Sequence, residues 1–307
     1  MEYILRTKGV SKKYHSKWVL KQVNMNIARG DIYGFVGENG SGKTTIIRII
    51  TGLIFADEGQ VELFGVADNS HEIYSARKKV GAIVESPSIY RNMSARENLE
   101  MQSEILGIRD KEKIKQVLGD VGLAYLYDDK KNVKNFSLGM RQRLGIAMAL
   151  LGDPEFIILD EPMNGLDPTG IVEIRELILR LNRERKITFL ISSHILTELS
   201  LVANKYGIIS HGSLIKELSA DELENVSRPN TVIEVSSPEA LWNVLCTFIS
   251  SENMTLLDNG VSITGHVDLT KTLNAILDAK IEILSINCNK SNIESYYMSL
   301  MGGERNA

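Results

Sequence analysis

The chain has 307 residues, of which 43% are hydrophobic and 24% are charged, so it can form one large globular domain or two ordinary ones. Its 35 basic and 39 acidic side chains give a net charge of −4, which argues against a general nucleic-acid-binding surface. Cys246 and Cys288 show no metal-binding spacing, so we expect buried thiols in a reducing compartment. Because no window reaches the ~20 apolar residues of a membrane span, we expect a cytosolic protein that meets a membrane only through a partner.

The first third of the chain predicts strands, a glycine-rich loop and a helix. Alternating apolar and polar residues predict strands at 3–6 and 18–27. A short apolar run at 32–36 predicts a buried strand. The helix that follows the glycine-rich loop is predicted from Lys43 to about Gly52. This part of the chain is therefore expected to contain an N-terminal antiparallel β part.

The middle of the chain, about 86–150, predicts a helical insert. Residues 94–97 read Ser-Ala-Arg-Glu, which fits a capping box at the start of a helix. A second amphipathic helix is predicted to open at Asp110. Ser137 is placed to cap a third helix, which is expected to run through Leu150.

Strands and helices alternate after the insert, and this order predicts an α/β domain with a largely parallel sheet. Strands are expected at 156–160, 187–192 and 206–210, the last of them ending the sheet. Helices are expected between them, at 171–184 and 195–203.

The C-terminal part of the chain predicts a second, smaller α+β domain. Composition changes near 227–229, so we divide the chain into domains 1–225 and 226–307. The second domain is predicted to contain strands near 231–236, 254–257, 261–265 and 281–287, and helices near 238–250, 269–279 and 291–301. A βαββαβ order with one further helix suits a ferredoxin-like module.

The glycine-rich stretch matches G-x-x-x-x-G-K-[ST] between a predicted strand and a predicted helix, which is the pattern of a P-loop. Glycines allow the backbone to direct N–H groups at phosphate oxygens, and the helix N-terminus favours negative charge. Lys43 is expected on the β- and γ-phosphates of ATP, and the Thr44 hydroxyl on Mg²⁺. The predicted nucleotide-binding residues of this loop are Gly37, Glu38, Asn39, Gly40, Ser41, Gly42, Lys43, Thr44 and Thr45.

Two carboxylates lie at the end of the predicted strand at 156–160: Asp160 is its last residue, and Glu161 is the residue after it. Asp160 is expected to hold Mg²⁺, and Glu161 to orient or deprotonate the water that attacks the γ-phosphate. Two acids at a strand end are common in solvated positions. Their place after a P-loop in one α/β unit favours the catalytic interpretation.

Residues 135–143 read Asn-Phe-Ser-Leu-Gly-Met-Arg-Gln-Arg and precede a predicted helix. Here the chain resembles the ATP-binding subunits of ABC transporters, whose signature reads Leu-Ser-Gly-Gly-Gln and is matched at Ser137 and Gly139. The resemblance spans roughly residues 1–225 and implies the P-loop NTPase cassette fold. It also implies that Ser137 and Gly139 bind the ATP held by the opposite subunit of a dimer.

The resemblance assigns three further positions in the same order along the chain. Tyr14 occupies the place of an aromatic residue that stacks on adenine, although packing explains a lone tyrosine equally well. Residues 164–167 resemble the D-loop, which crosses the dimer interface. His194 occupies the place of the switch histidine, which hydrogen-bonds to the γ-phosphate.

Glu85 departs from the family pattern, because most such cassettes have a glutamine there that contacts Mg²⁺ and the membrane partner. A carboxylate at this position would bind the metal more tightly or lie back from it. Together with residues 136–143, Glu85 makes the chain similar to the bacitracin-export and lantibiotic self-protection branch of the family.

The resemblance implies an ATPase whose homodimer, or heterodimer with a related cassette, encloses two ATP and Mg²⁺ on the inner face of the cell membrane. It would power export of a peptide antibiotic by a separate integral membrane permease, a role in antibiotic resistance, with the C-terminal domain as a dimerising, regulatory or ligand-sensing addition. Three alternatives are a chromosome-maintenance or repair ATPase, a translation factor and a non-hydrolysing regulator. The absence of heptad repeats before Ser137, the single cassette and the presence of Glu161 argue against them in turn.

Overall fold

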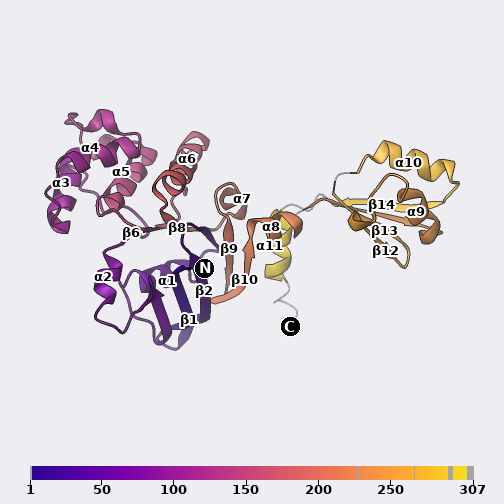
Figure 1. Ribbon diagram of the computed structural model, residues 1–307, viewed down its shortest axis with the longest axis horizontal. Helices are drawn as coiled ribbons and strands as arrows, with labels where there is room; N and C mark the ends of the chain where they lie inside the picture. The colour runs from indigo at the N-terminus through magenta and orange to yellow at the C-terminus, as the bar shows by residue number, and fades with distance from the viewer. Residues whose placement is uncertain (1, 227, 266, 290–292, 303–307) are drawn as a thin grey trace. The chain divides into compact units, whose positions relative to one another are not determined.

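The computed structural model describes residues 2–226, 228–265, 267–289 and 293–302. Contacts within the chain divide it into two compact units, Met1–Ala220 and Asp221–Ala307. Figure 1 labels the elements of both. Among the described residues, no helix is long and apolar enough to cross a membrane.

The first unit begins with an antiparallel sheet of strand order β2-β1-β4-β5. Its members are β1 (Tyr3–Tyr14), β2 (Lys17–Ala28), β4 (Glu58–Leu63) and β5 (Val66–Ala67). The predicted antiparallel β part is confirmed, but β1 is much longer than the 3–6 segment expected. Further register shifts with β2 lie between Thr7 and Lys13, so the strict alternation that marks a strand in sequence is lost beyond the expected segment.

The second sheet of this unit has the strand order β10-β9-β3-β8-β7-β6. Its strands are β3 (Ile32–Val36), β6 (Val80–Ile83), β7 (Phe156–Asp160), β8 (Thr188–Ser193), β9 (Lys205–Ser210) and β10 (Ser213–Ser219). Neighbouring strands are parallel except for β9 and β10, which confirms the largely parallel sheet. The expectation that 206–210 ends the sheet is wrong, because β10 folds back along β9 after a tight turn.

Helices surround and interrupt the parallel sheet. They are α1 (Lys43–Ile50), α2 (Ile73–Arg77), α3 (Ala95–Leu106), α4 (Glu112–Asp120), α5 (Leu138–Leu150), α6 (Pro168–Arg185) and α7 (Leu196–Leu199). A further helix, α8 (Ala220–Val226), begins at the last residue of this unit and otherwise belongs to the second unit. The capping box at Ser94 and the cap at Ser137 form as predicted. The helix expected at 195–203 is much shorter, because residues 200–202 form a turn that leads into β9.

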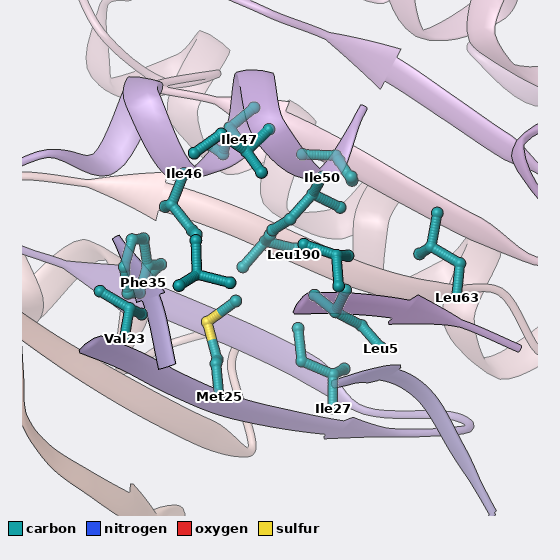
Figure 2. Close-up of a cluster of buried hydrophobic side chains, with 14 of the residues drawn as sticks. Leu5, Val23, Met25, Ile27, Phe35, Ile46, Ile47, Ile50, Leu63 and Leu190 are labelled. Carbon is teal, nitrogen blue, oxygen red and sulfur yellow. The ribbon is translucent and has the colours of Figure 1, made fainter. Parts of the chain in front are cut away.

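A buried cluster between the two sheets holds α1 in place (Figure 2). Ile46, Ile47 and Ile50 of α1 are fully buried, and Figure 2 shows them above Met25 of the antiparallel sheet and beside Leu190 of the parallel sheet. Burying each such side chain stabilises the fold by about 1.5–3 kcal/mol. The helix that starts at Lys43 is therefore fixed from both sides.

The second unit has a core and a sheet of its own. Its elements are β11 (Asn230–Val235), α9 (Pro238–Leu245), β12 (Met254–Leu257), β13 (Gly260–Thr264), α10 (Leu269–Asp278), β14 (Ile283–Asn289) and α11 (Ile293–Gly302). The antiparallel sheet has the order β12-β13-β11-β14, and the βαββαβ element order is the ferredoxin-like order expected. Ile233, Leu241 and Val261 are among its fully buried side chains.

Two details of the sequence expectations for this unit need comment. The helix expected at 291–301 begins outside the described residues, at 291–292, and is described from Ile293 onward. The expectation of buried cysteines is wrong, because Cys246 and Cys288 are both exposed free thiols. Cys246 follows the last residue of α9, and Cys288 lies on a strand at the edge of the sheet, where a small apolar side chain needs no cover.

Candidate nucleotide-binding site

The loop between β3 and α1 has a backbone that side chains would obstruct. Gly40 and Gly42 have positive φ angles of 82° and 111°, a conformation that L-residues with a Cβ rarely adopt. A Cβ on Gly42 would lie 2.7 Å from Leu20 Cδ2, and one on Gly37 would lie 2.5 Å from the backbone oxygen of Ile209. The loop is therefore shaped by both its glycines and its close neighbours.

Lys43 is the first residue of α1, and its side chain is only 6% exposed. Its ammonium donates to the backbone oxygen of Gly37 at 2.7 Å and that of Glu38 at 3.3 Å, so it folds back over the loop. It also forms an ion pair with Glu161 Oε1 at 3.2 Å. A buried ammonium with these partners is placed to meet the phosphate groups that the loop would hold.

Thr44 and Asp160 come together as the sequence pattern predicts. The Thr44 hydroxyl donates to Asp160 Oδ2 at 2.9 Å, and the Ser192 hydroxyl donates to Asp160 Oδ1 at 2.6 Å. Mg²⁺ in nucleotide sites is commonly held by one or two protein oxygens together with phosphates and water. No group of three His, Cys, Asp or Glu side chains among the described residues forms a complete metal cage, and Thr44 with Asp160 fits the partial site.

Glu161 is held at both of its carboxylate oxygens. Oε1 pairs with Lys43, and Oε2 lies 2.8 Å from Nδ1 of His194. Its backbone has φ +50°, a left-handed conformation that persists where neighbouring interactions fix it. One of these is the hydrogen bond from its N–H to the Ser192 hydroxyl at 2.9 Å. Glu161 therefore joins the end of the β7 strand to both proposed phosphate-contacting side chains.

The turn between β9 and β10 supports the phosphate loop from outside the motif. Gly212 donates its N–H to the backbone oxygen of Ser41 at 3.0 Å, and its own oxygen accepts from the N–H of Lys21 at 2.8 Å. A Cβ on Gly212 would lie 2.3 Å from the backbone oxygen of Val19. The turn thus links the loop to the antiparallel sheet.

A cleft beside Glu161 contains the D-loop segment and the start of α7. Asn164, Gly165, His194 and Glu198 are among the residues that line it. Burial raises the pKa of the Glu198 carboxyl, the nearby His194 opposes this shift, and the charge of Glu161 adds to it. Glu161, His194 and the segment that resembles the D-loop therefore line one cleft.

Ser137 and Gly139 lie at the start of α5, where the Ser137 hydroxyl accepts a hydrogen bond from the N–H of Met140 at 3.2 Å. Within the described part of the chain, no hydrogen bond or ion pair joins them to Lys43 or Glu161. Their neighbour is the D-loop instead: a Cβ on Gly165 would lie 3.3 Å from Leu138 Cδ2. Among the described residues of one chain, the phosphate loop and the signature residues therefore make no direct polar contact with each other.

Among the described residues, Tyr14 and Glu85 also make no hydrogen bond or ion pair with Lys43 or Asp160. Tyr14 ends β1 and is 42% exposed, with the Lys12 ammonium 5.7 Å from its ring centre. An exposed ring is available for stacking. Glu85 follows β6 in a left-handed conformation with φ +63°, and its carboxylate pairs with Arg48 of α1 rather than with Thr44 or Asp160.

The sequence analysis missed three residues that contact this region: Ser192, Gly212 and Arg48. They lie outside the motifs, and their contacts with the site depend on the fold. Ser192 did precede the histidine in a strand end, which is a position where parallel sheets gather functional side chains. Its hydroxyl could therefore have been suspected.

A P-loop at a helix start, an Asp-Glu pair at a parallel strand end and a signature helix define an ATP-binding cassette. A family model described as "ABC transporter" matches residues 20–164. The bacitracin transport ATP-binding protein BcrA of Bacillus licheniformis is 41% identical over 99% of each chain. The lantibiotic transport ATP-binding protein SrtF of Streptococcus pyogenes is 41% identical over 73% of this chain and 94% of its own.

Solved structures agree with these sequence comparisons. An ABC transporter cassette in its ADP conformation has a TM-score of 0.66 and 28% identity, covering 74% of this chain and 95% of its own. A dimeric cassette in a post-hydrolysis state with ADP and Pi has a TM-score of 0.63 and 25% identity, covering 70% and 98%. The chain belongs to the ATP-binding subunits of ABC transporters, and it is an ATPase. The predicted family, fold class and enzyme class are confirmed.

Proposed function

We propose that two copies of this chain, or one copy with a related cassette, close around two ATP molecules and drive export by a separate membrane permease. The observation that carries this proposal is the contact network of Lys43, Asp160, Glu161 and His194, to which Ser137 makes no hydrogen bond within the described part of the chain. A single chain then offers one face of a nucleotide site, and a partner completes it. ATP would act as the link between the two subunits.

In the mechanism, Lys43 leaves Glu161 for the β- and γ-phosphates of bound ATP. The freed carboxylate of Glu161 then orients the attacking water and accepts its proton. His194 hydrogen-bonds to the γ-phosphate and registers its loss, while Tyr14 stacks on adenine. When bound, Mg²⁺ neutralises phosphate charge, and Thr44 and Asp160 would hold it. Glu85 would reach the metal only after separating from Arg48.

The permease would dock in a groove formed by β6, the end of α1 and the helical insert. Leu53, Val84, Pro87 and Leu106 are among the residues that line it. Leu53 and Leu106 are exposed large apolar side chains, at 64% and 47%, which suits a groove that receives a helix from a partner. This docking would place the chain on the inner face of the cell membrane.

We further propose that the exported compound is a peptide antibiotic of the bacitracin or lantibiotic type. Supporting this are the likeness to BcrA over nearly the whole chain, including the C-terminal unit, and Glu85 in the position where the family usually has glutamine. The C-terminal unit would be a dimerising or regulatory addition.

Two measurements test the proposal at its two levels. With Glu161→Gln, which slows hydrolysis without changing the side chain's size, ATP and Mg²⁺ should shift the chain from monomer to dimer in analytical ultracentrifugation. Lys43→Ala should abolish both this shift and ATP turnover, and normal turnover in Lys43→Ala would refute the site.

In the native host, Glu161→Gln should raise sensitivity to bacitracin or one lantibiotic class, and no change in sensitivity to any of these compounds would refute the antibiotic assignment alone.

A further inference from the structure

The ion pair between Arg48 and Glu85 joins two elements with different tasks. Arg48 lies in the last turn of α1, four residues after Thr44, so the two side chains share one face of the helix. Glu85 lies just beyond β6, in a left-handed backbone conformation that neighbouring contacts must maintain. The pair therefore connects the helix that starts at the phosphates to the segment that follows β6.

The same two segments both contribute residues to the groove proposed for the permease. Thr51 and Leu53 follow Arg48, Val84 and Ser86 flank Glu85, and all four line the groove. The ion pair thus connects a part of the groove that is continuous with α1 to a part that is continuous with β6. A displacement of α1 would be passed to Val84 and Ser86 through this pair.

The burial of α1 makes such transmission physically reasonable. Ile46, Ile47 and Ile50 are fully buried between the two sheets, and close-packed helices shift as rigid bodies rather than bending residue by residue. Lys43 at the first turn and Arg48 at the last turn are therefore ends of one rigid element. A displacement of α1 at its phosphate end would therefore also displace Arg48.

We propose that Arg48 is a positioning residue, which holds the Glu85 carboxylate and so couples the occupancy of the phosphate loop to the permease groove. This inference rests on the proposed function. It also accounts for a glutamate where the family has a neutral glutamine, because an arginine can form an ion pair with a carboxylate but not with a neutral amide. Both side chains are partly exposed, at 38% and 60%, so the pair contributes little to stability and its loss should leave the fold intact.

Hydrogen exchange of the full-length chain tests this coupling without a permease. All variants carry Glu161→Gln so that ATP remains bound, and amide exchange is followed in the peptide covering residues 84–90, with and without ATP and Mg²⁺. In the parent, ATP should change the exchange rate of this peptide by about fivefold or more. Arg48→Gln should reduce that change to less than about twofold while the ATP dissociation constant stays within about twofold.

A matched control is Arg6→Gln, because Arg6 has a similar exposure of 42% and pairs with Glu62 in the antiparallel sheet. It should respond to ATP as the parent does. In a Glu85→Gln background, adding Arg48→Gln should cause no further change, since the ion pair is already lost.

Two outcomes would overturn the inference. One is an undiminished ATP response in Arg48→Gln, and the other is an equal further loss when Arg48→Gln is added to Glu85→Gln. Failure of the parent chain to bind ATP would instead refute the proposed function, and with it the inference. That failure is seen in the affinity measurement before any exchange rates are compared.

Discussion

Ser192 has a hydroxyl group that serves both acidic residues of the site. It is fully buried, donates to Asp160 and accepts from the N–H of Glu161. Replacing a buried hydrogen-bonding group so that its partners remain unsatisfied typically costs about 1–3 kcal/mol. We expect Ser192→Ala to lower the free energy of unfolding by this amount in urea titrations, and to lower kcat because Glu161 loses a backbone restraint.

Ser193→Ala is the control for this prediction. Ser193 is also buried, but among the described residues its hydroxyl accepts from the nearby N–H of Ile195 and contacts neither carboxylate. We expect a stability loss without a comparable fall in kcat. Equal losses of kcat in both variants would show that Ser192 has no special relation to the carboxylates.

Gly42 and Gly40 separate two costs of a side chain in the phosphate loop. Both have positive φ, but a Cβ meets Leu20 only at Gly42, while nothing lies within 4 Å at Gly40. Gly40→Ala should cost about 1–2 kcal/mol from backbone strain, and Gly42→Ala should cost more and abolish ATP binding. Urea unfolding and ATP titration would measure both, and equal losses of stability would contradict the role of the Leu20 contact.

At the scale of single residues, the sequence identified those site residues that belong to short motifs. Lys43, Thr44, Asp160, Glu161 and His194 were all proposed from their patterns, and the fold brings them into direct contact. Ser192, Gly212 and Arg48 were not, because their partners lie far away in sequence. Long-range contacts of this kind leave no periodic or local signal.

Two helices begin at a serine whose hydroxyl accepts a hydrogen bond from a backbone N–H of the first turn. Ser137 caps α5 and Ser94 caps α3, and removing such a cap typically costs about 1 kcal/mol. We expect Ser137→Ala and Ser94→Ala to lose similar stability in thermal unfolding. Only Ser137→Ala should weaken the ATP-dependent dimer by about tenfold or more, because a charge-assisted bond to phosphate would be lost.

Analytical ultracentrifugation of both serine variants in the Glu161→Gln background would measure this difference. If Ser94→Ala weakens the dimer as much as Ser137→Ala, the effect comes from helix stability rather than from contact with ATP. The caps themselves were predictable, because a serine before an apolar-periodic run is a local signal. The end of α7 was not, since the turn at 200–202 depends on where β9 must begin.

The whole molecule consists of two units, each with its own buried core. A ligand stabilises only the unit that binds it, by about 2.7 kcal/mol when its concentration is a hundred times the dissociation constant. We expect differential scanning calorimetry of Glu161→Gln to show two transitions, of which ATP with Mg²⁺ raises only one. A single transition, or an equal shift of both, would show that the units unfold together.

At this scale the order of strands and helices along the chain was predicted well from the sequence. The alternation of strands and helices indicated the parallel sheet, and the C-terminal pattern indicated the βαββαβ order, because both depend on local periodicity. The position of β10 was missed, since an edge strand after a tight turn has only a weak apolar pattern.

The turn at Gly212 sets a lower limit on where this chain can be shortened. A fragment that ended at Ser210 would include every nucleotide motif, yet it would lack the glycine that bridges Ser41 and Lys21. Anyone preparing a minimal recombinant fragment for crystallisation or for fusion to another protein would therefore need to keep the chain through β10. The useful boundary is set by the support of the loop and not by the last recognisable motif.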